Sequence, residues 1–299
     1  MRAAAFQSLA VGFFDGVHLG HREILRGASA ALTFSNHPLS VLAPGRAPRL
    51  IMSVEDRVAA IRACGVADVT VVDFTPELAK TQAEDFVGLL ERRLGRRLPA
   101  FRCGENWRFG RGGEGDADFL RQRGMLVEVA PYVEYKGERI SSSRIRASLE
   151  RGEIEDANAM LGRRFTVRGV VTRGKGVGAR IGYPTVNLRV VAPASGALLA
   201  LPLGVYEVAL NGRLGVANYG LAPTFGDRAW RTPVLEVHLL PERSSPPDLQ
   251  AQEAASVEVF RFLRPERKFA SVGELKAQIA ADCAAVGHIR EGLRQSTPV

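Results

Sequence analysis

The order of helix-like and strand-like segments changes once along this chain, and that change constrains the fold more than any other feature. Up to about residue 161, short apolar runs typical of buried strands alternate with segments of helical periodicity. We expect strands at 8–14, 31–34, 69–74, around Phe101 and at 127–133, and helices at 18–27, 54–64, 81–95, 142–151 and 153–161. This alternation predicts a parallel sheet covered by helices, a Rossmann-like doubly wound α/β domain.

From Phe165 onward the predicted elements are short strands separated by turn residues. We expect them at 165–171, 204–210, 213–218, 234–240 and 257–262, followed by an amphipathic helix at 272–285. This pattern predicts a small antiparallel β-barrel with a C-terminal helix. The boundary is expected near Gly162, which gives domains of 1–162 and 163–299, and a length of 299 residues suits two domains.

The composition is that of an ordinary globular protein, with 46% hydrophobic and 24% charged residues. No apolar run approaches the roughly 20 residues that a membrane-spanning helix needs, and the first residues lack the layout of a signal peptide. Cys64, Cys103 and Cys283 are scattered and have no CxxC spacing, which argues against a disulfide framework or a zinc site. We therefore expect a cytoplasmic protein without a membrane partner.

The net charge of +8 raises the question of nucleic-acid binding. The basic residues are spread along the chain, and the densest cluster, at 92–97, lies on a predicted helix, where a solvated face is the simpler explanation. A basic balance also suits polyphosphate substrates. We expect no nucleic-acid partner, and the pattern leaves the oligomeric state open.

The segment from Gly12 to His21, GFFDGVHLGH, connects the first predicted strand to the first predicted helix. Such a junction directs backbone N–H groups and the helix dipole at a phosphate. His18 and His21, in the form HxGH, can donate to the phosphates of ATP and stabilise the charge that develops on the bridging oxygen. The alternative is a pair of surface histidines beside a loop, and the position of the motif favours the phosphate site.

Two further segments of the first half suggest ligand contacts. Serine hydroxyls and arginines in 139–146 open a predicted helix and resemble an anion site, although a simple helix cap gives the same pattern. The aromatic loop 104–110 can hold a flat ring or a ribose, and the alternative there is core packing by Trp107 and Phe109.

In the second half, the segment 174–187 joins a glycine-rich turn to a Pro-Thr-x-Asn element. No long helix follows it, so it is neither a Walker A motif nor a dinucleotide fingerprint. Thr185 and Asn187 offer oxygens suited to Mg²⁺, and a glycine turn before a strand is the alternative. Glu236 lies inside the apolar strand 234–240, where a carboxylate is either a general base or a paired structural glutamate.

Taken in order, the motifs resemble one family. FDGVHLGH, TF-x-x-HP at 33–38, GENWRFG and ISSSRIR are similar to the adenylyltransferase half of the bacterial bifunctional riboflavin kinase/FAD synthetases. The segments at 204–206, 216–225, 235–238 and 262–269 resemble the riboflavin kinase module of the same family. The resemblance implies ATP-dependent phosphorylation of riboflavin to FMN, then transfer of AMP from a second ATP to FMN, giving FAD and pyrophosphate, both with Mg²⁺.

The resemblance also implies roles for individual residues. In the first half, His18 and His21 are the expected catalytic residues, and ATP is expected to contact Gly12, Phe14, His18, His21, Asn106, Ser142, Ser143 and Arg146. In the second half, ATP is expected to contact Gly176, Gly178, Thr185 and Asn187, with Thr185 and Asn187 also binding Mg²⁺. Glu236 is the expected general base, which takes the proton from the terminal ribityl hydroxyl as that hydroxyl attacks the γ-phosphate.

The chain departs from the family pattern in four places. The segment 22–32 is shorter than usual in the family. Val186 stands where the family commonly has alanine, and Ala179 and Arg180 alter a stretch that is commonly Gly-Arg. The segment 241–252 replaces an acidic turn. The shortened first helix leaves open a chain that is active only as a kinase. Two hypotheses of a different class are a flavin-binding regulator without turnover and a basic RNA-binding protein. The intact histidines, Thr185, Asn187 and Glu236 weigh against the regulator.

Overall fold

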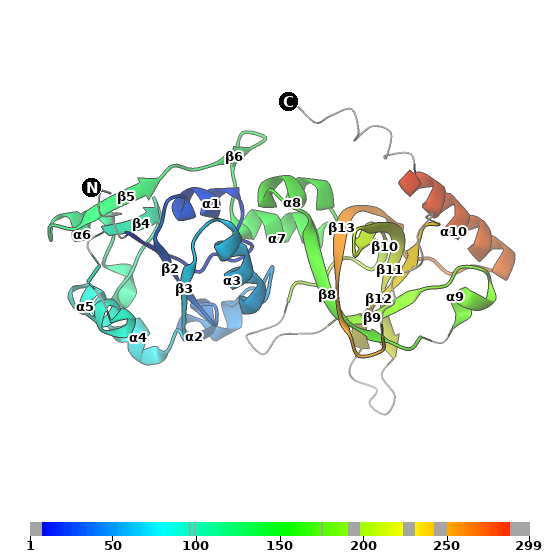
Figure 1. Ribbon diagram of the computed structural model, residues 1–299, viewed down its shortest axis with the longest axis horizontal. Helices are drawn as coiled ribbons and strands as arrows, with labels where there is room; N and C mark the ends of the chain where they lie inside the picture. The colour runs from blue at the N-terminus through cyan, green and yellow to red at the C-terminus, as the bar shows by residue number, and fades with distance from the viewer. Residues whose placement is uncertain are drawn as a thin grey trace. The chain divides into compact units, whose positions relative to one another are not determined.

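The computed structural model describes residues 8–95, 97–98, 100–174, 176–190, 198–223, 231–241 and 250–287. Contacts divide the chain into two compact units (Figure 1). The first comprises Met1–Arg146, Met160–Gly162 and Ala192–Leu199, and the second comprises Ala147–Ala159, Arg163–Val191 and Ala200–Val299.

A five-stranded parallel sheet forms the centre of the first unit. Its strands are β1 (Ser8–Val11), β2 (Ala30–Phe34), β3 (Asp68–Val72), β4 (Ala100–Gly104) and β5 (Leu126–Ala130), in the order β3-β2-β1-β4-β5. The order reverses beside β1, and ligands of such sheets bind at the carboxyl ends of the strands next to this point. The predicted Rossmann-like domain is therefore confirmed.

Helices cover both faces of this sheet because its strands are apolar on both sides. Leu9 and Val11 of β1 pack into one cluster with Phe86 and Leu90 of α5 (Ala83–Leu94). Ala10 packs on the opposite face, in a cluster with Leu25 of α1 (Leu19–Leu25) and Ile61 of α3 (Val54–Ala63). Successive residues of a strand point to opposite faces, so one short strand contributes to two cores.

Shorter elements complete the N-terminal region. They are α2 (Leu39–Leu42), η1 (Pro44–Arg46), α4 (Pro76–Lys80), η2 (Arg111–Gly113), α6 (Ala117–Arg121), the hairpin of β6 (Glu134–Tyr135) and β7 (Glu138–Arg139), α7 (Ser142–Glu150) and α8 (Ile154–Leu161). The helix α1 has seven residues, in agreement with the short segment noted in the sequence.

The second unit is a closed antiparallel barrel. Its strands are β8 (Phe165–Thr172), β9 (Val186–Val190), β10 (Gly204–Leu210), β11 (Arg213–Pro223), β12 (Arg231–Leu239) and β13 (Ala254–Pro265), in the order β10-β11-β12-β9-β8-β13. One helical turn, α9 (Val177–Arg180), precedes β9, and the helix α10 (Val272–Gly287) follows the barrel. The predicted barrel and terminal helix are confirmed.

Several element boundaries differ from the sequence predictions. The first strand ends at Val11 rather than residue 14, because Phe14 and Val17 take the left-handed conformation, with φ of 54° and 40°. The strand expected at 213–218 continues to Pro223, and β9 was not predicted. Lys175, Thr224 and Phe225 of the quoted motifs, and most of the segment 241–252, lie outside the described residues.

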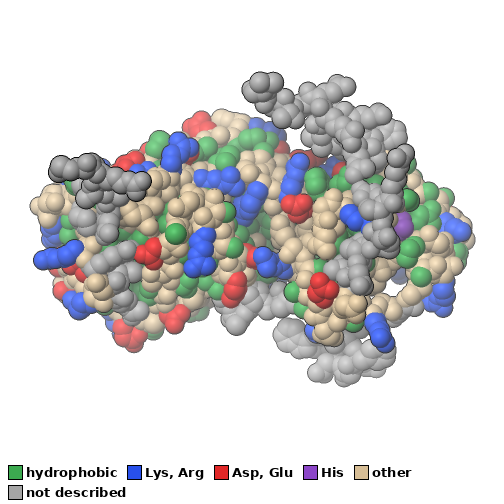
Figure 2. All heavy atoms as spheres, viewed as in Figure 1, with side chains coloured by type: hydrophobic (Ala, Val, Ile, Leu, Met, Phe, Trp, Pro, Cys, Tyr) green, Lys and Arg blue, Asp and Glu red, His purple; other side chains and the backbone are tan. Residues whose placement is uncertain are grey.

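Basic side chains are interspersed with acidic ones on the face drawn in Figure 2. Within the described part of the chain, none of the helices combines the length and the apolar composition needed to cross a membrane.

An ion pair fastens α10 to the barrel. Arg264 on β13 donates through Nε and Nη2 to the carboxylate of Asp282, at 3.0 and 2.7 Å, and Gln278 donates to the same carboxylate at 2.8 Å. Asp282 is only 6% exposed, so its removal would leave a largely buried guanidinium without its anion.

We predict that Asp282→Ala loosens α10. The loss of the partly buried pair should lower the free energy of opening of this helix by about 2 kcal/mol, so its amides should exchange with solvent roughly 30-fold faster. Hydrogen exchange followed by mass spectrometry measures this directly. Lys276→Ala, at an exposed position of the same helix, is the control. Equal exchange in both variants would show that the ion pair does not hold the helix.

Candidate active sites

A cavity of about 380 Å³ lies at the carboxyl ends of β1 and β4 in the first unit. All eight residues that the sequence placed in the first site line it: Gly12, Phe14, His18, His21, Asn106, Ser142, Ser143 and Arg146. They come from the loop after β1, from α1, from the loop after β4 and from the first half of α7. Segments far apart in the chain are therefore brought to one place, as expected from the order of the motifs.

The loop after β1 is shaped by close contacts. The Gly12 amide donates to the Leu32 carbonyl at 3.1 Å. A Cβ at Gly12 would lie 2.9 Å from the ring of Phe14, so a larger residue would displace that ring. Gly16 has φ of 85°, which favours glycine. The loop consequently turns back within a few residues and delivers His18 to the start of α1.

His18 and His21 form one stacked pair, with ring centroids 3.6 Å apart. His18 is the N-cap of α1, and its Nδ1 accepts from the His21 amide at 3.2 Å, which places the proton of neutral His18 on Nε2. Burial, with the neighbouring His18 and the cations Arg57, Arg139 and Arg146, holds the pKa of His21 well below 6.5. Neutral His21 can therefore donate one N–H to an anion, and His18 can donate from Nε2 beside it.

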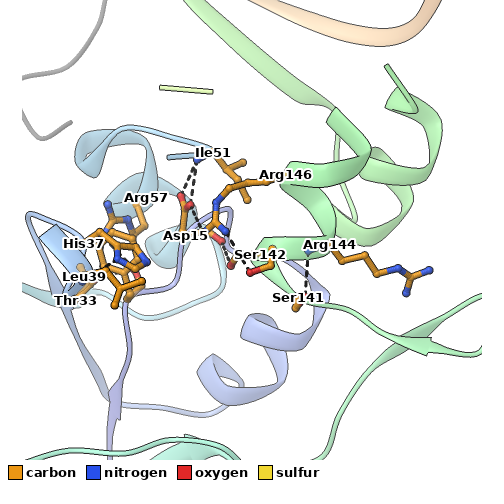
Figure 3. Close-up of polar contacts among 12 residues, drawn as sticks. Asp15, Thr33, His37, Leu39, Ile51, Arg57, Ser141, Ser142, Arg144 and Arg146 are labelled. Atoms are coloured by element: carbon orange, nitrogen blue, oxygen red, sulfur yellow. Dashed lines mark hydrogen bonds and ion pairs between the residues drawn. The ribbon is translucent and has the colours of Figure 1, made fainter. Parts of the chain in front are cut away.

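Asp15 links the loop after β1, which leads to His18, to the helix α7 (Figure 3). Its carboxylate is 1% exposed, accepts from the Ile51 amide at 3.1 Å and pairs with Arg146 Nη2 at 3.2 Å. Its carbonyl accepts from the Ser142 hydroxyl at 2.8 Å. Burial raises the pKa of Asp15, and the bonds to Ile51 and Arg146 oppose that rise.

No role was predicted from the sequence for Asp15 or His37. His37 lines the same cavity, its Nδ1 accepts from the Leu39 amide at 3.1 Å, and burial together with Arg146 and Arg57 lowers its pKa to about 4. Both residues stand inside motifs that were quoted, so their positions were visible. What the sequence did not reveal is that Asp15 is turned inward as a partner of Arg146.

The aromatic loop after β4 contributes both to the core and to the wall of the cavity. Phe109 is 6% exposed and stacks on Phe86 with ring centroids 4.8 Å apart, so it belongs to the core. Trp107 packs against the same core and also lines the cavity, beside the exposed Asn106. One indole thus joins the core to the cavity wall.

A second cavity, of about 560 Å³, lies in the barrel unit. Gly178, Thr185 and Glu236 of the predicted set line it, together with Asn218, His238 and Glu266. Asn187 stands directly behind Thr185 and donates through Nδ2 to its hydroxyl at 3.3 Å. Gly176 is the N-cap of α9, with φ of 67°. The predicted residues of the second half therefore cluster around one cavity, although Asn187 and Gly176 are not in its wall.

Strand register brings Glu236 to this cluster. Glu236 of β12 pairs with Asn187 of β9 on one side and with Asn218 of β11 on the other. Asn218 in turn donates to Glu266 at 2.9 Å, so two carboxylates border the cavity near one amide. Asn218 and Glu266 lie in motifs that were quoted, but no role was predicted for them.

The glycine-rich segment is closely packed where it meets Thr185. A Cβ at Gly178 would lie 2.3 Å from the Tyr183 carbonyl, and one at Gly174 would lie 2.4 Å from Asn187 Nδ2. The His238 ring bonds to the Pro184 carbonyl at 2.9 Å through Nδ1. These contacts favour glycine at both positions and hold the Pro-Thr element beside β12.

Two oxygen donors of the kind that Mg²⁺ prefers lie close together at this end of the barrel. The Thr185 hydroxyl precedes β9 and lines the cavity, and the Asn187 amide lies on β9 and bonds to that hydroxyl. Mg²⁺ in nucleotide-binding enzymes takes few protein ligands and several phosphate or water oxygens, so this donor set fits a metal that arrives with a nucleotide. Among the described residues, no three or more His, Cys, Asp or Glu side chains form a cluster suited to a metal.

Comparison with known proteins gives consistent results. The FAD synthetase family matches residues 2–144, and the riboflavin kinase family matches residues 161–289. The bifunctional riboflavin kinase/FMN adenylyltransferase of Escherichia coli (strain K12) is 34% identical over 293 residues, which cover 92% of this chain and 90% of that protein. The protein of the same name from Bacillus subtilis (strain 168) is 31% identical over 296 residues, covering 92% and 89%.

A solved structure has the same fold. The crystal structure of a macrolide-efflux protein from Streptococcus pneumoniae superimposes with a TM-score of 0.80 at 26% identity, covering 95% of this chain and 94% of that chain. Since both families match in order and relatives of at least 30% identity match nearly end to end, the chain belongs to the bifunctional riboflavin kinase/FMN adenylyltransferase family.

Proposed function

We propose that the two activities of this enzyme are divided between its two cavities. The barrel cavity phosphorylates riboflavin with ATP to give FMN, and the cavity of the α/β unit transfers AMP from ATP to FMN, giving FAD and pyrophosphate. The observation that carries this division is that each cavity is lined by residues of one unit alone. All eight residues expected for adenylylation line the first cavity, and Gly178, Thr185 and Glu236 of the set expected for the kinase line the second.

Adenylyl transfer needs mainly positioning and charge stabilisation, because the nucleophile is already an anionic phosphate of FMN. An FMN phosphate oxygen attacks the α-phosphorus of ATP, and the bond to the bridging oxygen breaks as pyrophosphate leaves. We assign His18 and His21 to donate N–H groups to the phosphates, which their stacked rings and the lowered pKa of His21 support. Arg146, Ser142 and Ser143 complete the phosphate site, with Asn106, Gly12 and Phe14 in the ATP-binding wall.

Phosphorylation of riboflavin needs a base because its nucleophile is a hydroxyl. We assign Glu236 to take the proton from the terminal ribityl hydroxyl while the hydroxyl oxygen attacks the γ-phosphorus of ATP and ADP leaves. Thr185 and Asn187 would hold Mg²⁺ with the ATP phosphates, and Gly176 and Gly178 would let the backbone approach them. Bound Mg²⁺ neutralises phosphate charge as the nucleophile approaches.

We propose further that the catalytic modules divide near Gly162 and that the enzyme works in the cytoplasm. The matched family ranges end at 144 and begin at 161, which supports the division. Cys64, Cys103 and Cys283 are all free thiols, as expected in a reducing compartment.

We predict that His21→Ala strongly slows FAD formation from FMN and leaves FMN formation from riboflavin unchanged. The substitution removes one donor from the phosphate site, a change that costs on the order of 100- to 1000-fold in rate in comparable sites. Chromatographic assay of FMN and FAD from each substrate checks both activities. Loss of both activities in a folded protein would contradict two separate sites.

We predict the reverse for Glu236→Gln. This variant should lose FMN formation by at least about 100-fold, the usual effect of removing a general base, while converting supplied FMN to FAD at the normal rate. Glu258→Gln, an exposed glutamate on β13, is the matched control. A Glu236→Gln enzyme that phosphorylates riboflavin normally would rule out the base.

We predict that Asp15→Asn weakens FAD formation through Arg146. The amide retains an acceptor for Ile51 but removes the charge that holds the guanidinium, so kcat/KM for ATP should fall on the order of 10- to 100-fold. Steady-state kinetics of FAD formation gives this value, and Asp118→Asn, which breaks the exposed pair with Arg121, should change little. An unchanged kcat/KM would show that Arg146 needs no such support.

A further inference from the structure

Arg57 is an unusual residue of the α/β unit, because its side chain is completely buried. It lies on α3 with 0% exposure. Its Nη1 donates to the carbonyls of Phe13 and Phe34, at 3.1 and 2.7 Å. The same nitrogen lies 3.2 Å from the hydroxyl of Thr33, and Figure 3 labels Arg57 and Thr33 beside each other. One guanidinium nitrogen thus joins the loop after β1 to the end of β2.

The other two nitrogens of the guanidinium form no such hydrogen bonds. Its Nε and Nη2 are buried and have no hydrogen-bond partner among the described residues. Burial of a cation without full pairing is costly, and an apolar side chain of similar size would fill the same space without that cost. The hydrogen bonds to two backbone carbonyls therefore do not explain why a positively charged residue is buried at position 57.

The charge lies directly behind the wall of the first cavity. The guanidinium carbon is 4.0 Å from the centroid of the Phe13 ring, and that ring meets the His37 ring edge-on at 4.7 Å. Phe13 and His37 both line the cavity. One aromatic ring therefore separates the buried cation from the space assigned to ATP.

The described lining of this cavity has little negative charge to oppose Arg57. Asp15 is its one acidic residue, and its carboxylate forms an ion pair with Arg146. Asp15 and Glu55 also favour the charged form of Arg57 against the effect of burial. Charges act over longer distances in a poorly hydrated interior than in water. Arg57 thus adds positive potential to a site that must hold a triphosphate.

We propose that Arg57 is a positioning residue of the adenylyl-transfer site, which supplies a fixed positive potential to the phosphates of ATP and to the departing pyrophosphate. This inference rests on the assignment of the first cavity to FMN adenylylation. Two effects on neighbouring groups agree with it: after burial and other neighbours, Arg57 contributes to lowering the pKa of His21 and that of His37. Burial lowers the pKa of Arg57 itself to about 10, so it stays charged at neutral pH.

Three substitutions in the full-length enzyme separate charge from hydrogen bonding. Arg57→Lys keeps the charge and a donor, Arg57→Gln keeps a donor without the charge, and Arg57→Met keeps neither. Arg62→Met, at an exposed position of the same helix, is the control. The readouts are kcat/KM for FAD formation and inhibition by two probes that compete with ATP, inorganic pyrophosphate and adenosine. Inhibition by adenosine reports an intact site that is independent of phosphate charge.

A role of the charge predicts a specific pattern. Arg57→Gln and Arg57→Met should lower kcat/KM on the order of 10- to 100-fold and weaken pyrophosphate inhibition about tenfold, while adenosine inhibition changes less than about twofold. Arg57→Lys should retain most of the pyrophosphate affinity. If Arg57→Met does not fold, the comparison of Arg57→Gln with Arg57→Lys gives the same test.

Three results would overturn the proposal: unchanged kinetics in Arg57→Gln, equal weakening of pyrophosphate and adenosine, or loss of pyrophosphate affinity in Arg57→Lys as large as in Arg57→Gln. The second result would mean that Arg57 only supports the local fold. Failure of the site assignment itself is detected separately, because His21→Ala would then make FAD normally whatever the Arg57 variants do.

Discussion

The buried contact between Asp15 and Arg146 is the interaction on which the adenylylation site depends. Its two residues are separated by most of the α/β unit in sequence, yet the carboxylate meets the guanidinium at 3.2 Å and also accepts from the Ile51 amide. This contact holds the loop after β1, which leads to His18, against the helix α7. Together with the bond from the Ser142 hydroxyl to the Asp15 carbonyl, this pair joins the serines of α7 to the loop that carries His18.

The two cavities are built by different physical means. The first uses buried charge, since Asp15, Arg57 and Arg146 are all largely withdrawn from solvent. Burial lowers the pKa of His21, and Arg57 and Arg146 add to that effect. The second uses strand register and close backbone approach, with Glu236 between its strand neighbours and glycines where a side chain would collide. A preorganised charged pocket suits phosphate-to-phosphate transfer, and a carboxylate on a barrel strand suits a reaction whose nucleophile must lose a proton.

Much of this organisation was predictable from the sequence. Alternating strand-like and helix-like segments predicted the first fold, and a series of short strands predicted the second. The order of the motifs predicted which segments meet, because the carboxyl ends of neighbouring parallel strands lie at one edge of a sheet. Side-chain direction was not predictable. Asp15 and Arg57 are charged residues that the fold turns inward, and only tertiary packing decides that. Likewise β1 ends early because Phe14 and Val17 adopt left-handed backbone, a conformation that their residue types disfavour.

The most direct test of the central claim, one chain with two active cavities, is the time course of products from riboflavin, ATP and Mg²⁺ with the purified enzyme. We predict that FMN accumulates first and is then consumed as FAD and pyrophosphate appear. FMN that accumulates without any FAD would contradict a working first cavity, and the short helix α1 would be the first place to look. Flavin that stays bound but unconverted would contradict both.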